Sequence, residues 1–188
     1  MMDVTDSDLD LIRRAKAGEH QAFDVLMRRY NRRTYQVIYG LTHNHADAED
    51  LTQDAFIRAF EHIRSFKEEY RFYTWLYRIA VNLTFTFLKR RKLAPVSLTT
   101  DDDVETDVPD EKAVPVDEHL DRKRNIEKAL NDLPEEQRLA LVLRTYEELS
   151  YAEIASVMHT SIGTVMSRLS RAREKMRESL KDYIAGTR

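Results

Sequence analysis

The residues with the clearest chemical potential lie between positions 66 and 92. Six of the 17 aromatic residues of the chain fall within positions 66–77, and rings in a loop can stack on unpaired bases at about 1–3 kcal/mol per base. The amide of Asn82 can read a base edge, and the run from Lys89 to Lys92 suits duplex phosphates. The alternative is an aromatic core beside a solvated helix end. The candidates for capturing an opening DNA strand are Phe66, Tyr70, Phe72, Tyr73, Arg78, Asn82, Lys89 and Arg90.

A second candidate surface lies between positions 150 and 177. Ser150 and Glu153 form a capping box that starts a short helix, and Thr160 and Ser161 suit the cap of a second one. The second helix has a buried face at helical spacing, formed by Val165, Leu169, Ala172 and Met176. Its opposite face is polar and rimmed by guanidinium groups, which suits a DNA major groove or, alternatively, a solvated surface. The candidate DNA contacts are Thr164, Ser167, Arg168, Ser170, Arg171 and Arg173.

A third polar group stands near the start of the helix expected over 44–63. Its members are Glu49, Asp50, Gln53 and Asp54. Acids at a helix start favour the helix dipole, which explains them without any partner. The functional alternative is a polar docking surface for a helical protein.

Enzymatic and metal-dependent chemistry finds little support. The chain has no cysteine, which excludes disulfides and thiolate metal sites and suits a cytoplasmic location. His43 and His45 fall at a helix boundary without the spacing of metal ligands. No phosphate loop, nucleophile elbow or dinucleotide fingerprint occurs, and no apolar segment resembles a signal peptide or a membrane span. We therefore expect no cofactor, no metal, no membrane insertion and no catalysis.

Helical periodicity organises the rest of the chain. Apolar stripes predict helices over 8–17, 19–41, 44–63, 74–92, 117–133 and 134–147, while strand-like alternation is absent. Residues 93–117 hold three prolines, one lysine and eight acids, so they predict a flexible acidic linker. We expect an all-α protein of two small helical domains, 1–92 and 118–188, joined by this linker. The two ends are only weakly basic, so a partner must hold the chain on DNA.

Five ordered motifs carry a family resemblance. They are AEDLTQDAFIRAF at 48–60, FYTWLYRIAVN at 72–82, LPEEQR at 133–138, LSYAEIA at 149–155 and GTVMSRLSRAR at 163–173. Together they resemble the bacterial extracytoplasmic-function (ECF) sigma factors, which give RNA polymerase its promoter specificity. The likeness covers nearly the whole chain except the linker. Met166 stands where family members often carry a basic residue.

The resemblance implies a role for each surface. Residues 1–92 would be sigma domain 2, which reads and melts the −10 element with the 66–92 residues. Residues 118–188 would be sigma domain 4, which reads the −35 element and meets the polymerase β flap. The contacts with the β′ clamp helices would come from Glu49, Asp50, Gln53, Asp54 and Phe56. An anti-sigma factor is a further expected partner.

Two other functions stay open on the residues alone. A stand-alone helix-turn-helix regulator would use only positions 133–182 and would leave the 66–92 stretch unexplained. A helical adaptor would bind only proteins. Core-polymerase binding and promoter-dependent transcription separate these two from a sigma factor.

Overall fold

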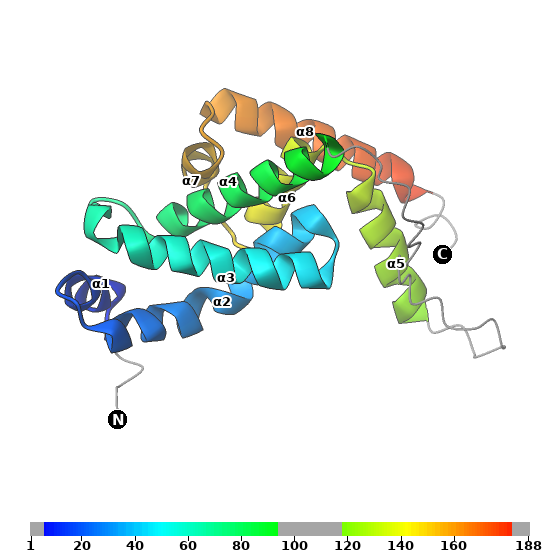
Figure 1. Cartoon of the computed structure of the whole chain (residues 1–188). Coiled ribbons are helices and arrows are strands. Elements are labelled where there is room, and N and C mark those ends of the chain that lie inside the picture. The colour runs from blue at the N-terminus through cyan, green and yellow to red at the C-terminus, as the bar shows by residue number, and fades with distance from the viewer. Residues whose placement is uncertain (1–5, 94–117, 182–188) are drawn as a thin grey trace.

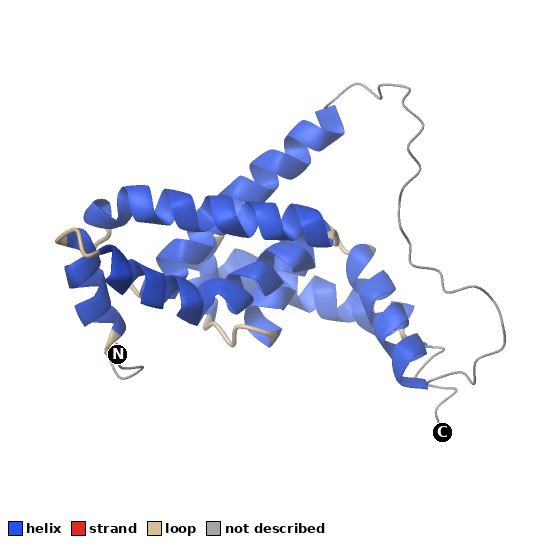
Figure 2. Ribbon diagram, turned by 60° about the horizontal axis from the view of Figure 1, so that its bottom comes forward, coloured by secondary structure: helices blue, strands red, loops and turns tan. Residues whose placement is uncertain are grey.

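The computed structural model describes residues 6–93 and 118–181, and every regular element in these ranges is a helix (Figure 1, Figure 2). The all-α prediction is therefore confirmed. The elements are α1 (Asp8–Lys16), α2 (His20–Thr42), α3 (His45–His62), the short 3-10 helix η1 (Ile63–Ser65), α4 (Phe72–Leu93), α5 (Glu118–Asn131), α6 (Glu135–Thr145), α7 (Tyr151–Val157) and α8 (Ile162–Ser179).

Capping residues and a glycine turn set the boundaries of the first helices. The Ser7 side chain accepts a hydrogen bond from the Asp10 amide at the start of α1, and Asn44 accepts one from Asp47 at the start of α3. Gly18 lies in the turn after α1 with φ +97°, a left-handed conformation that glycine adopts without steric cost. The local residues therefore determine where the chain turns.

Helices α1 to α4 pack around an apolar core. Leu11, Leu26 and Leu76 have no exposed surface, and Phe56 lies beside them at 4% exposure. These positions belong to the apolar stripes expected from the sequence. In Figure 1, α2, α3 and α4 run alongside one another, and α1 crosses the first part of α2. The long helices hold the 66–71 loop at one end of the bundle.

Helices α6, α7 and α8 build the expected helix-turn-helix. Ser150 and Glu153 make both hydrogen bonds of the capping box that begins α7, and Ser161 caps α8. Val165 and Leu169 of α8 are buried. Pro134 was expected at the first helical position, but it is the residue before α6 because its ψ of 139° is not helical. The polar face of α8 is left on the outside.

One apolar cluster joins the two ends of the chain. Val37 and Leu41 of α2 and Val81 of α4 pack with Leu139 and Leu143 of α6. Helix α7 packs against α4, and α6 packs against α2 (Figure 1). The described parts of both expected domains are therefore packed directly against each other.

The acidic linker lies almost wholly outside the described residues, which resume at Glu118 after Leu93. Its predicted flexibility is therefore not tested here. None of the helices in the described ranges is long and apolar enough to cross a membrane.

Candidate nucleic-acid interface

The rings of the 66–77 stretch divide into a buried and an exposed set. Phe66 and Phe72 are each 3% exposed, with their ring centroids 5.9 Å apart, and both pack against Trp75. Because both rings are buried, they cannot stack on a base in this conformation, contrary to the role expected from the sequence. They pack in the core beneath the 66–71 loop. Tyr70 is 51% exposed and presents a free ring. Trp75 is partly buried and packs against the same core.

A hollow opens beside the Tyr70 ring. It is lined by Ser65, Lys67, Tyr70, Trp75, Arg78, Ile79, Asn82 and His159. Three residues that the sequence singled out, Tyr70, Arg78 and Asn82, therefore meet at one place. A ring, a guanidinium and an amide are the groups needed to hold a base and its phosphate.

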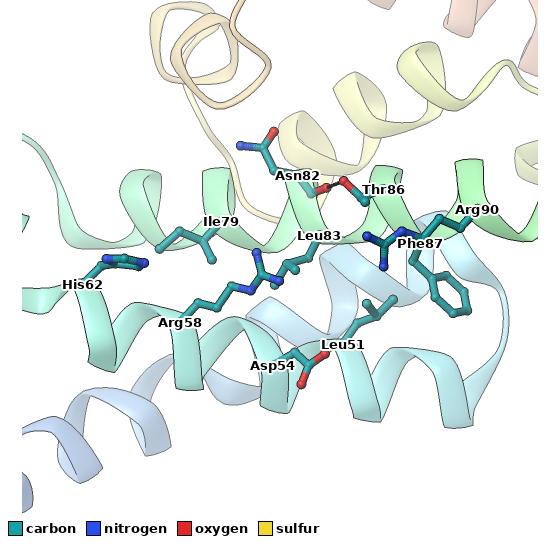
Figure 3. Close-up of a pocket in the computed structure, with 10 residues that line it drawn as sticks. All are labelled: Leu51, Asp54, Arg58, His62, Ile79, Asn82, Leu83, Thr86, Phe87 and Arg90. Carbon is teal, nitrogen blue, oxygen red and sulfur yellow. Dashed lines mark hydrogen bonds between the residues drawn. The ribbon is translucent and has the colours of Figure 1, made fainter.

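A groove between α3 and α4 extends this surface (Figure 3). Its apolar floor includes Leu83, and its rim includes Asn82 and Arg90. Figure 3 shows Arg58 of α3 and Arg90 of α4 reaching toward each other over Leu83. Both arginines are exposed, and neither makes an ion pair within the described residues. Lys89 is exposed but does not line the groove.

Sequence reasoning missed the contribution of Arg58 and of His62, which also lines the groove. Positions 54, 58 and 62 recur every four residues on α3, and positions 82, 86 and 90 do the same on α4. Residues at this spacing share one face of a helix. The four-residue spacing of these polar side chains on both helices could therefore have predicted a polar groove between α3 and α4.

The neighbouring side chains of α4 contact the C-terminal helices. Tyr73 donates a hydrogen bond to Glu153, and Tyr77 donates one to Glu147. Burial, followed by the bond to Glu153, raises the pKa of Tyr73 to about 12. Burial also raises the pKa of the Glu147 carboxyl above its ordinary value, despite the hydrogen bond from Tyr77. Both phenols are therefore fixed as donors at neutral pH.

Arg78 makes the third polar contact with the C-terminal helices. Its Nε donates to Nε2 of His159 at 3.2 Å. Burial and the adjacent guanidinium lower the pKa of His159, which keeps this imidazole neutral. Of the expected strand-binding residues, Tyr73 and Arg78 thus already have partners within the chain.

Helix α8 presents the expected polar face. Ser167, Ser170, Arg171 and Arg173 are exposed. The Thr164 hydroxyl is 2.9 Å from that of Ser161 at the start of the helix. On the side facing α6, Arg168 pairs with Glu136 and its side chain is only 18% exposed. Met166 is 54% exposed on the same helix.

The start of α3 carries the expected polar surface, with Glu49, Asp50, Gln53 and Asp54 all exposed. Phe56 differs because it is 4% exposed and belongs to the core. The apolar contact surface lies one residue further on. Ile57 is 56% exposed, and Phe60 and Met27 are each 37% exposed around a groove between α2 and α3. Sequence reasoning missed these side chains, which line an apolar groove beside the acids.

The geometry defines a helix-turn-helix and a second, ring-lined surface at the 66–71 loop and α4. Family models agree: the model for sigma-70 region 2 matches residues 26–93, and the model for sigma-70 region 4 matches residues 123–176. The chain belongs to the sigma-70 family, among the ECF sigma factors of bacterial RNA polymerase. Members of this family are non-catalytic subunits of transcription initiation.

Relatives match over nearly their full length. The RNA polymerase sigma-H factor of Pseudomonas aeruginosa is 36% identical over 95% of this chain and 96% of its own. The ECF sigma factor SigW of Bacillus subtilis is 34% identical over 91% of this chain and 95% of its own. Both likenesses therefore include the two matched regions.

Solved structures share the fold. CnrH in complex with the cytosolic domain of CnrY matches with a TM-score of 0.72 and 25% identity, over 94% of this chain and 99% of that one. RpoE of Bartonella quintana, crystallised with the anti-sigma factor NepR, matches with a TM-score of 0.68 and 26% identity, over 85% and 96%.

Proposed function

We propose that this chain directs core RNA polymerase to its promoters in the cytoplasm, with one surface for each promoter element. The observation that carries the proposal is that the ring-lined hollow and the polar face of α8 are both present in a chain matched by region 2 and region 4 models. The test is run-off transcription of genomic DNA with core enzyme and the purified chain. Specific duplex binding without polymerase would favour a stand-alone regulator, and no promoter-dependent transcript would favour an adaptor.

In this proposal, the −10 strand lies along the loop and α4. One base stacks at Tyr70, Asn82 reads a base edge, and Arg58 and Arg90 contact phosphates along the groove. Tyr73, Arg78 and Lys89 complete the surface, while Phe66 and Phe72 support it from the core. Asn82→Ala should impair promoter opening more than initial binding to duplex DNA. Equal loss of both steps would contradict the strand-reading role.

The −35 element is assigned to α8. Ser167, Ser170 and Arg171 occupy the centre of the exposed face, with Arg168 and Arg173 at its edges. Thr164 stands at the helix start. Arg171→Ala should weaken −35 recognition by roughly 1–3 kcal/mol without affecting folding, because its side chain is exposed. An unchanged promoter profile would rule out its role.

Polymerase docking is assigned to α3 and the neighbouring groove. Gln53 lines this groove, and the acids Glu49, Asp50 and Asp54 lie exposed on the same helix. Ile57 and Phe60 supply the exposed apolar contact. An apolar groove beside polar residues suits a partner helix, for which the β′ clamp helices are the proposed candidate. The β flap is the proposed partner of the C-terminal helices.

An anti-sigma factor is the remaining proposed partner. Two structural neighbours are complexes, of CnrH with the cytosolic domain of CnrY and of RpoE with the anti-sigma factor NepR. Purifying this chain from its own cell and identifying the small protein that comes with it tests this partner directly.

A further inference from the structure

Two exposed apolar side chains stand near the start of α8, on the helix to which the −35 element is assigned. Ile162 is 49% exposed and Met166 is 54% exposed. Their four-residue spacing places them on one side of the helix. Met166 also lines a hollow that it shares with Tyr151 of α7. The helix that faces DNA therefore begins with an apolar edge, and neither of its residues is among the DNA contacts expected from the sequence.

The polar side chains of the same turns are short or already bonded. The Ser167 hydroxyl donates to the carbonyl of Thr164 at 2.9 Å. Arg168, the first charged residue of the helix, pairs with Glu136. Ahead of Arg168, Met166 is therefore the longest side chain that α8 exposes. These first turns offer DNA an apolar contact in place of a free charged group.

A major groove contains one apolar feature that such a side chain can recognise. The start of a recognition helix is the part that meets base edges in this groove. Among the four bases, only thymine carries a methyl group there, and apolar side chains contact it. The methionine side chain is unbranched and flexible, so it can adapt to the position of that methyl group. A lysine or arginine at position 166 would instead bind phosphates of any sequence.

We propose that Met166 is a specificity-determining residue that selects a thymine in the −35 element by packing against its C5-methyl group, with Ile162 at the border of the same contact. The inference rests on the proposed function of α8 in reading that element. Continuity favours DNA as the occupant, because Ser170 and Arg171 are exposed on the same helix of a chain whose residues 123–176 match the sigma-70 region 4 model. Burying one methyl group changes an equilibrium constant by about fourfold.

Replacing thymine by uracil tests the contact, because the two bases differ only by the methyl group. A promoter is first mapped with the wild-type chain and core enzyme, and uracil then replaces each −35 thymine of either strand in turn. The readout is equilibrium binding of the holoenzyme to these duplex fragments at one fixed salt concentration, since binding to DNA depends strongly on salt. We expect uracil at one position to weaken binding of the wild-type holoenzyme about fourfold.

Variants at position 166 assign this effect to the side chain. Met166→Ala should weaken binding to the thymine promoter and abolish the response to uracil at that position. Met166→Leu keeps an apolar side chain and should retain a response of about twofold or more. Ser170→Ala is the matched control on the same helix, because it removes a hydroxyl and leaves Met166 in place. It should lower affinity for the thymine and uracil promoters by the same factor.

The possible outcomes separate the proposal from its alternatives. A uracil response that persists in Met166→Ala, or the absence of any responsive −35 thymine, would overturn the proposal. Weaker binding of Met166→Ala to core polymerase without DNA would also overturn it, because the apolar edge would then belong to a protein interface. Absence of any promoter-dependent transcript with the wild-type chain would instead overturn the proposed function, and the selection of thymine with it.

Discussion

The hydrogen bond between Tyr77 and Glu147 allows a quantitative test of the interdomain contact. The phenol is 1% exposed, and its hydroxyl donates to the half-buried Glu147, whose other carboxylate oxygen is buried without a partner. Tyr77→Phe removes the donor and leaves the ring in place. A hydrogen bond to a charged group contributes about 1.5–3 kcal/mol. Because the pKa of Glu147 is raised, the carboxyl can protonate when the donor is lost. The expected loss is therefore in the lower half of that range, about 2 kcal/mol.

The assay is urea and thermal unfolding followed by circular dichroism. A loss of about 2 kcal/mol corresponds to a fall in Tm of roughly 4–8 °C for a chain of this length. Tyr73→Phe is the matched control, because its partner Glu153 keeps hydrogen bonds from the Ser150 amide and hydroxyl. We expect that control to lose less than about 1 kcal/mol.

A double-mutant cycle with Glu147→Gln isolates the pair. If the reasoning is right, Tyr77→Phe costs much less in the Gln background than in the wild type. Equal losses in both backgrounds, or the same loss for Tyr73→Phe and Tyr77→Phe, would refute it.

Three further outcomes are expected. Burial and Arg138 hold the pKa of His43 at about 4. The imidazole is therefore protonated at a lower pH in the folded chain than in the unfolded chain. Stability from His43 is therefore complete above about pH 6.5 and falls by up to about 3 kcal/mol toward pH 4. His43→Asn, which tolerates the left-handed φ of 50°, should flatten that part of a pH series of unfolding measurements. The raised pKa of Glu147 acts in the opposite direction and remains in both proteins. Ile57→Asp should weaken binding to core polymerase at least tenfold in a pull-down without lowering Tm, and a lower Tm would reveal a core role instead. Phe66→Ala should destabilise the chain by about 3–5 kcal/mol, whereas Tyr70→Ala should leave Tm unchanged and weaken strand binding; the reverse pattern would contradict the division of the rings.

Helix positions were largely predictable from local residues. Capping by Asn44, Ser150 and Ser161 depends on bonds to residues three positions ahead, and such short-range chemistry can be read from the chain. The apolar stripes also identified the buried faces, because helical spacing determines which side chains share a face.

The exposure of individual rings was less predictable. Phe66 and Tyr70 lie in the same segment, yet one is 3% exposed and the other 51%. Which ring turns inward depends on the path of the loop after η1, and residue type does not encode it. The exposure of Ile57 was equally hard to predict. It is an apolar residue next to a buried stripe, and nothing in the neighbouring sequence indicates that it faces outward.

The packing of the two ends against each other was not predictable either. Tyr77 and Val81 fit the apolar pattern of α4 whether their partners lie in α2 or in α6. Gly40 looks like an ordinary interruption of a helix until the methyl groups of Val142 are seen beside it. Contacts between segments far apart in the chain leave no periodic trace in either one.

The capping box of α7 separates the local folding of the helix-turn-helix from its contact with α4. Glu153 binds Tyr73 through one carboxylate oxygen and Ser150 through the other. Departure of the phenol therefore leaves the first turn of α7 fully bonded, and water can replace the lost donor. The start of the helix-turn-helix is therefore held by bonds within its own sequence and does not depend on Tyr73.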